Sequence, residues 1–87
     1  MLEEFVGEKV VVDFRSEFVC LGTFKGFDAQ FLELTRADLH DLRDTDTTRE
    51  VYVVDSVRTG IKKNRKRVLV NRADVVAIAL LSDVAIE

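Results

Sequence analysis

The sequence predicts an all-β fold, a small and strongly bent five-stranded barrel with a short helix inserted between the third and fourth strands. Three observations predict it. Apolar and polar residues alternate with a period of two near the start of the chain. A long candidate strand follows, with Gly22 and Gly26 inside it. Two almost continuously apolar runs then lie near the end of the chain.

The first two strands are defined by their alternation. Val10 and Val12 fall on one face of residues 10–15, while Asp13 falls on the other. Residues 18–25 alternate in the same way, and Gly22 shares a face with Gly26, four residues on. Glycine inside a strand marks a bulge, a bend or a close backbone approach. A long strand bent in this way is what a strongly curved small barrel requires.

Residues 28–30 are predicted to turn the chain, and a third strand is expected over residues 31–37. A polar, turn-rich stretch over residues 38–46 then opens an inserted segment that spans about residues 39–65.

A short helix is predicted inside this segment. Thr47 as N-cap and Glu50 three residues later have the spacing of a capping box, and Gly60 would cap the C-terminal end. The β-forming residues 51–54 favour a strand instead, so both assignments stay open for residues 48–59. The helical residues expected to share one face are Val51, Val54, Val57 and Arg58.

The last two strands, residues 68–70 and 75–81, carry the evidence about assembly. A strand that is apolar on both faces is normally covered on both, and an exposed apolar edge invites uncontrolled pairing. Edge-to-edge pairing with further copies, repeated head to tail, would close a homo-oligomeric ring. Coverage by the N-terminal segment and the inserted helix within one subunit is the alternative. The residues expected in the ring contact are Val68, Leu69, Val70, Val76, Ile78 and Leu80.

The run that begins at Gly22 resembles the first signature motif of the Sm and Sm-like proteins, which build rings that bind RNA. The family pattern reads Gly-x-Leu-x-x-x-Asp-x-x-Met-Asn. Gly22, Phe24, Asp28 and Phe31 occupy its Gly, Leu, Asp and Met positions, and Leu32 stands in place of the Asn.

A second stretch, residues 70–78, fits the spacing of the family's second motif, with Asn71-Arg72 in place of Arg-Gly. The resemblance implies a five-stranded barrel of SH3-type curvature, which forms rings through its fourth and fifth strands. It also implies a pocket for single-stranded, usually uridine-rich RNA. In the family, the base stacks at the Met position, is hydrogen-bonded by the Asn and is backed by the Arg.

Carried onto this sequence, the resemblance implies a pocket of five residues. Phe31 would stack a base and Asp28 would orient the loop. Because the leucine after Phe31 has no polar atom, Gln30 or Asn71 would have to make the base-edge contact, and Arg72 lies one place beyond the family's Arg position. The alternative makes Phe31 a core or interface aromatic and Asp28 a turn residue that bonds backbone amides.

Composition describes one globular domain over residues 1–87, with 47% apolar and 33% charged residues. A chain of this size buries only about 60–65% of its unfolded surface, so an oligomer would add useful burial. The start of the chain is acidic and has no signal-peptide apolar region, and no apolar run reaches the roughly 18 residues that span a bilayer. With Cys20 as the single cysteine, we expect a cytoplasmic protein without a membrane partner.

Basic residues gather in one segment of a chain whose net charge is −3. Repeated around a ring, they would form a positive collar that contacts phosphates with a salt-dependent affinity. The alternative is a solvated hairpin tip that protects strand edges. The residues of this basic segment are Arg58, Lys62, Lys63, Arg65, Lys66 and Arg67.

Catalytic and metal-binding motifs are not found in the sequence. His40 and Cys20 are the only histidine and cysteine, which excludes a zinc-type cluster, and no phosphate-binding glycine loop occurs. We therefore expect no enzyme activity, no cofactor and no metal. The expected function is a ring-forming Sm-like protein that binds or scaffolds single-stranded RNA by base stacking and phosphate contacts. The alternative is a ring that has lost its RNA pocket and serves protein–protein assembly.

Overall fold

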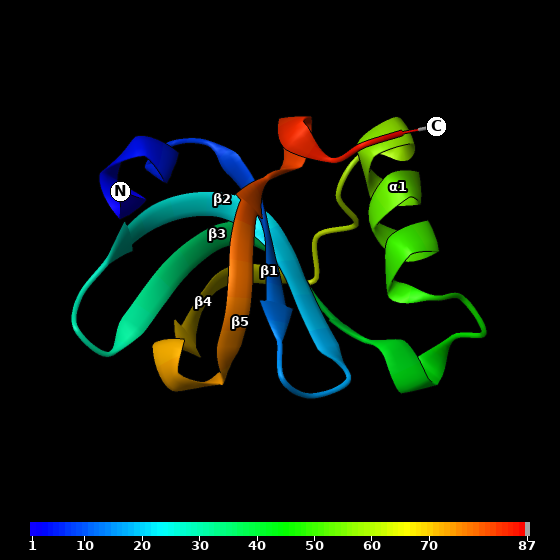
Figure 1. Ribbon diagram of the computed structural model, residues 1–87, viewed down its shortest axis with the longest axis horizontal. Helices are drawn as coiled ribbons and strands as arrows, with labels where there is room; N and C mark the ends of the chain where they lie inside the picture. The colour runs from blue at the N-terminus through cyan, green and yellow to red at the C-terminus, as the bar shows by residue number, and fades with distance from the viewer. Residues whose placement is uncertain (87) are drawn as a thin grey trace.

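The computed structural model describes residues 1–86 and contains one antiparallel five-stranded sheet in the order β4-β3-β2-β1-β5 (Figure 1). The strands are β1 (Lys9–Phe14), β2 (Phe18–Phe27), β3 (Phe31–Asp41), β4 (Arg65–Asn71) and β5 (Val75–Leu80). The helical elements are α1 (Arg49–Thr59) and the 3-10 turns η1 (Leu2–Phe5), η2 (Leu42–Asp44), η3 (Arg72–Asp74) and η4 (Leu81–Asp83). This architecture confirms the predicted fold class of a bent five-stranded sheet with one inserted helix.

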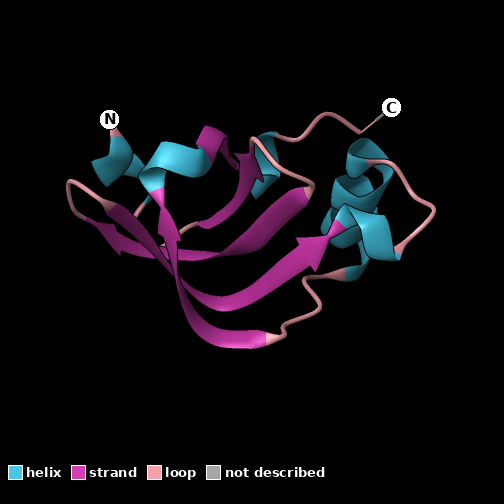
Figure 2. Ribbon diagram, turned by 90° about the horizontal axis from the view of Figure 1, so that it is seen from below, coloured by secondary structure: helices cyan, strands magenta, loops and turns pink. Residues whose placement is uncertain are grey.

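The sheet bends at the first of the two glycines of β2. The pairing of β2 with β3 shifts register across Gly22 and again just before Gly26. A Cβ added at Gly22 would lie 3.0 Å from the Ala37 Cβ and 3.1 Å from the Thr35 carbonyl oxygen, which is too close for comfortable packing. Arg36, between those two residues, has a φ of 49°. Gly22 therefore permits a close backbone approach, and Figure 2 shows the strong curvature of the sheet.

Both faces are buried in the middle of β1 and in the first half of β2, where residues 10–12 and 18–21 are continuously apolar. One face contributes to a cluster inside the bent sheet, where Phe5 of η1 meets the Phe24 ring edge-on with centroids 6.5 Å apart. The opposite face packs under α1 and η4. The buried residues of the inner cluster are Val10, Val12, Cys20, Phe24, Leu32, Leu34, Ala37 and Val70. Those of the outer cluster are Val11, Val19, Leu21, Val53 and Leu81.

Helix α1 lies in residues 48–59, the segment for which the sequence left both a helix and a strand as possible assignments. The predicted N-cap is wrong by one residue, because the Thr48 hydroxyl accepts the Val51 N–H at 3.2 Å. The Thr47 hydroxyl is instead hydrogen-bonded to that of Thr45 at 3.0 Å. Gly60, with a φ of 95°, ends the helix as predicted. No helix within residues 1–86 has the length and apolar character needed to cross a membrane.

The buried face of α1 is offset from the face that Val51, Val54, Val57 and Arg58 were expected to share. Val53 and Ser56 are the buried residues of the helix, and Tyr52 and Val57 pack beside them against the outer cluster. Val51 is 47% exposed. Residues 52 and 56, and residues 53 and 57, form two i, i+4 pairs that lie over the apolar surface of the sheet. Contact with the sheet therefore decides which face of the helix is buried, and the valine spacing alone does not indicate it.

Strand β3 is longer than predicted and continues past Ala37 to Asp41. Its polar extension pairs with the apolar start of β2, where Leu39 lies opposite Cys20 and Asp38 opposite Leu21. Pairing and burial therefore override the turn-forming tendency of these residues. As a result, the segment that joins β3 to β4 spans residues 42–64.

The two edge strands of the sheet, β4 and β5, do not pair with each other. Most residues predicted for the ring contact face the inner cluster instead: Val70 is buried in it, and Val68, Ile78 and Leu80 pack against it. Leu69 and Val76 point outward and are 45% and 65% exposed. The apolar character of these strands is thus partly explained by the chain's own core, and the large side chains of Leu69 and Val76 remain uncovered at the edges.

Candidate functional site

Two turns meet at one end of the sheet, and they bring together the five residues of the predicted pocket. Strands β3 and β4 pair with Phe31 opposite Asn71, so the β2–β3 turn lies beside η3. The Arg72 N–H donates to the Gln30 carbonyl oxygen at 2.9 Å. The Arg72 guanidinium donates to the Asp28 carbonyl oxygen. We call the group Asp28, Gln30, Phe31, Asn71 and Arg72 the turn cluster.

The β2–β3 turn is fixed by its aspartate. Asp28 Oδ1 accepts the backbone N–H groups of Phe31 at 2.7 Å and of Gln30 at 2.8 Å. These bonds hold the pKa of the Asp28 carboxyl below its usual value. Asp28 is therefore a turn residue that bonds backbone amides, and it sets the direction in which β3 leaves the turn.

The side chains of the turn cluster remain accessible. Gln30, Asn71 and Arg72 are exposed, and Phe31 is half-buried. Asn71 Oδ1 accepts the Ala73 N–H at 3.0 Å, while its amide nitrogen has no hydrogen-bond partner among residues 1–86. The cluster thus presents an aromatic surface, two amides and a guanidinium at one place.

Leu32, the residue that departs from the Sm pattern, is 2% exposed and packs in the inner cluster. It points away from the side of β3 on which Phe31 lies, because neighbouring side chains in a strand alternate. Any polar contact to a ligand at the turn cluster has to come from Gln30, Asn71 or Arg72.

The basic segment lies at the opposite end of β4. From Arg65 to Asn71 the strand runs six residue steps, or about 20 Å at the usual rise of a β-strand. Arg67 forms an ion pair with Glu33, with 2.6 Å between the Arg67 Nε and the carboxylate. The predicted site residues therefore form two separate groups: the turn cluster and the basic residues Lys62, Lys63, Arg65, Lys66 and Arg67.

One group of polar residues lies beside the basic segment and has no counterpart in the sequence prediction. The Tyr52 hydroxyl of α1 donates to the carboxylate of Asp38, which is 5% exposed, and the Tyr52 ring stacks on His40 with centroids 4.0 Å apart. Burial and the nearby carboxylate raise the pKa of Tyr52. Its partners lie more than ten residues away on a different element, so no local motif could reveal the group.

Metal ligands are not assembled anywhere within residues 1–86, where no three His, Cys, Asp or Glu residues are placed to hold an ion. Cys20 is fully buried in the inner cluster, and burial raises the pKa of its thiol to about 12. The thiol is therefore protonated at neutral pH and acts as a small apolar side chain.

Comparison with known proteins finds a likeness in structure. No protein-family model and no curated protein sequence matches the chain. A solved structure of an Sm protein from Pyrococcus abyssii in complex with a uridine heptamer aligns with a TM-score of 0.62. The match covers 91% of this chain and 90% of that one, at 16% sequence identity. On this evidence the chain has the Sm fold.

Proposed function

We propose that this protein is a ring-forming, non-catalytic Sm-like protein that binds or scaffolds single-stranded RNA by base stacking and phosphate contacts. The observation that carries the proposal is the bridge from Arg72 to the Asp28 and Gln30 carbonyl oxygens. This bridge joins the two motif-bearing turns into one accessible cluster. The similar Sm protein was solved with a uridine heptamer, which supports RNA as the ligand.

In the proposed complex, each residue of the turn cluster has a separate role. A base stacks on the ring of Phe31, and the amides of Gln30 and Asn71 bond its edge. The guanidinium of Arg72 lies beside the ligand as a positive charge. Because Leu32 is in the core, the site has fewer base-edge contacts than the family motif provides, and stacking is tolerant of base identity. We therefore expect only a weak preference for uridine over adenine.

The unpaired edges of the sheet support the ring. If β4 of one subunit pairs with β5 of the next, the backbone groups of both edges are satisfied and the contact repeats head to tail. Leu69 and Val76 would be covered in this contact. The ring would also repeat the turn cluster, so that one RNA strand contacts several subunits and gains affinity from multivalency.

The basic segment supports the phosphate contacts. Lys62, Lys63, Arg65 and Lys66 are exposed and take part in none of the ion pairs found in residues 1–86. Together they would add a salt-dependent, sequence-independent part of the affinity. We further propose the cytoplasm as the compartment, which suits the free Cys20 thiol.

A second candidate function is protein–protein assembly on a ring without an RNA site. The exposed side of α1 favours it, because Val51 is 47% exposed there and Val54 is only partly buried. This surface would serve as the docking face.

Fluorescence anisotropy with short U-rich and A-rich RNAs, at low and high salt, tests the RNA proposal. We expect binding at low salt, weakened by Phe31→Ala by at least about fivefold, because base stacking contributes about 1–3 kcal/mol per base. Phe18→Ala, at the far end of β2, is the matched aromatic control and should bind normally. The absence of binding at low salt would contradict the proposal, and unchanged binding by Phe31→Ala would exclude the turn cluster.

A further inference from the structure

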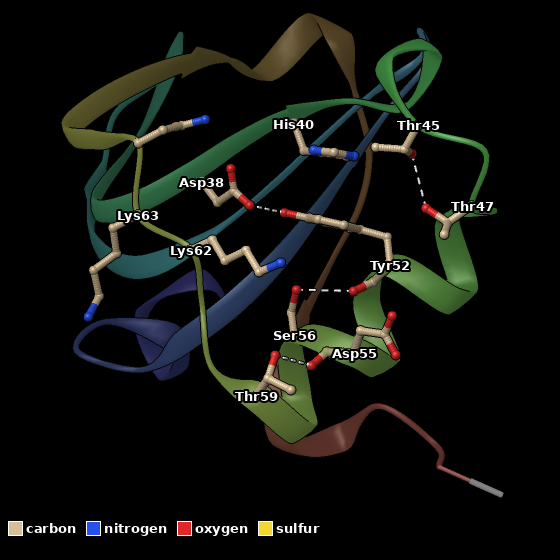
Figure 3. A pocket seen from close by; sticks show the side chains of 11 residues that line it. Asp38, His40, Thr45, Thr47, Tyr52, Asp55, Ser56, Thr59, Lys62 and Lys63 are labelled. Atoms are coloured by element: carbon tan, nitrogen blue, oxygen red, sulfur yellow. Dashed lines mark hydrogen bonds between the residues drawn. The ribbon is translucent and has the colours of Figure 1, made fainter.

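A cavity of about 610 Å³ lies between α1, the end of β3 and the segment that leads into β4 (Figure 3). This volume is within the usual range of small-molecule sites, about 300–1,000 Å³. The cavity lies beside the basic segment, at the other end of β4 from the turn cluster. The residues that carry the argument are Asp38, Tyr52, Asp55, Ser56, Lys62 and Lys63, all of which line it.

A fixed aromatic ring spans this cavity. The Tyr52 ring is held at its hydroxyl by Asp38 and on one side by His40, whose ring is nearly parallel to it at 4°. In Figure 3 the ring reaches from α1 toward Asp38, with His40 on one side and Lys62 and Ser56 on the other. The second face of the Tyr52 ring is thus turned toward the cavity, in an orientation that can stack a flat ligand.

The cavity also has unpaired positive charge. Lys62 and Lys63 line it, and neither forms an ion pair with any residue in the range 1–86. In Figure 3, Lys62 extends toward Tyr52, whereas Lys63 extends away from it. Lys63 also lines a neighbouring cavity of about 270 Å³, together with Arg36, Arg65 and Lys66. The lining of the neighbouring cavity has four basic residues and no acidic one, whereas Lys62 and Lys63 share the first cavity with the carboxylates of Asp38 and Asp55. The positive field that attracts an anion is therefore centred on the neighbouring cavity, beside the first one.

Hydrogen-bond acceptors line the α1 side of the cavity. The Ser56 hydroxyl donates to the Tyr52 carbonyl oxygen at 3.0 Å, and the Thr59 hydroxyl donates to the Asp55 carbonyl oxygen at 2.8 Å. Both hydroxyl protons are therefore used, which leaves the oxygen atoms as acceptors. The Asp55 carboxylate adds two more. This side of the cavity is suited to ligand hydroxyl groups that donate.

We propose that this cavity binds a nucleotide. Its base stacks on the free face of Tyr52, and its ribose hydroxyls donate to Asp55 and to the Ser56 hydroxyl oxygen. Its phosphate contacts Lys62 and lies toward the neighbouring basic cavity, which Lys63 also lines. An aromatic ring, sugar hydroxyls and a phosphate are the three features of this one ligand class that match the three parts of the cavity. The ligand is either a free nucleoside monophosphate or the terminal nucleotide of an RNA. The site goes beyond the proposed RNA contact at the turn cluster and does not depend on it.

Intrinsic fluorescence gives a specific test, because Tyr52 is the only tyrosine and the chain has no tryptophan. Uridine and adenosine monophosphates should quench Tyr52 emission at lower concentration than uridine or inorganic phosphate. N-acetyl-tyrosinamide corrects for absorption by the base. Titration calorimetry gives the affinity of the same ligands. The double variant Lys62→Ala/Lys63→Ala should bind about tenfold more weakly, because it removes the charge-assisted contacts to the phosphate. Lys25→Ala, an exposed lysine on β2, is the control and should bind normally.

Two further arms separate this site from the turn cluster and identify the source of the nucleotide. Quenching that persists in Phe31→Ala/Arg72→Ala supports the inference even if RNA binding at the turns fails. Quenching by RNA with a 5′-phosphate but not by free nucleotides assigns the ligand to an RNA end, and the reverse assigns it to a free nucleotide. The absence of quenching and of heat with all probes at millimolar concentration would overturn the inference. Binding that is unchanged in Lys62→Ala/Lys63→Ala would overturn it as well.

Discussion

Gly22 and Gly26 lie in the same strand but have opposite surroundings, which makes them a matched pair for mutation to alanine. A Cβ at Gly22 would lie 3.0 Å from the Ala37 Cβ and 3.1 Å from the Thr35 carbonyl oxygen, whereas one at Gly26 has nothing within 4 Å. Both substitutions reduce the entropy of the unfolded chain equally, which contributes about 0.4–1 kcal/mol of stability. The difference between the variants therefore isolates the steric contact.

We expect Gly22→Ala to be less stable than Gly26→Ala by about 1–3 kcal/mol, the usual cost of overpacking a buried site. Urea unfolding followed by circular dichroism at one fixed protein concentration measures this difference, because any oligomer makes stability depend on concentration. Ala37→Gly should recover part of the loss in Gly22→Ala, since it removes the nearest side-chain atom. Equal stability of the two alanine variants would refute the inference that β2 and β3 approach at Gly22 because no side chain is there.

Three further predictions concern α1, the η2 turn and the RNA contact. Thr48→Ala should lower the free energy of unfolding by about 0.5–2 kcal/mol and Thr47→Ala by much less, because only Thr48 caps the helix; urea unfolding compares them. The hydrogen bonds from Arg43 lower the pKa of Asp41 from 3.8 to about 2. The ionised Asp41 therefore stabilises the fold above about pH 4, and this stabilisation is lost as the pH falls toward 2. In Asp41→Asn, the free energy of unfolding measured in acid titrations should depend less on pH between these two values. The RNA affinity of the wild-type protein should fall with rising salt, and a slope unchanged in Lys62→Ala would exclude a phosphate contact there.

The parts of the fold that depend on neighbouring residues could be predicted from the sequence. Alternation located β1 and β2, Gly22 marked the bend, and residues 28–30 marked the turn. The helix was correctly ended at Gly60. Each of these features is encoded within a few residues, where side-chain periodicity and backbone conformation decide the outcome.

The features that were missed depend on distant partners. Thr48 and not Thr47 caps the helix, because the Thr47 hydroxyl is hydrogen-bonded to that of Thr45. The sequence does not show which of the two adjacent threonines is the cap. Strand β3 extends to Asp41 because β2 pairs with it and Tyr52 satisfies Asp38. Each of these outcomes is a contact between elements, which the spacing of residues along the chain does not contain.

Only part of the candidate site could be predicted, because the rest depends on where distant elements lie. The motif spacing correctly placed the residues of the turn cluster next to one another, because both turns are defined by the strands that flank them. The basic residues were predicted as a separate positive collar, and β4 does separate them from the turn cluster. That the turn cluster binds RNA and that the sheet edges form a ring are the two proposals to test.

Native mass spectrometry with a short uridine-rich RNA at low salt tests this central claim most directly. We predict a single closed assembly, with a mass equal to one fixed multiple of the 9.9 kDa chain plus RNA, because head-to-tail pairing that closes has one size. Val76→Asp, which places a charge on the exposed edge of β5, should shift the assembly to smaller species. A monomer at micromolar concentration, or a ring that does not retain RNA, would contradict the account.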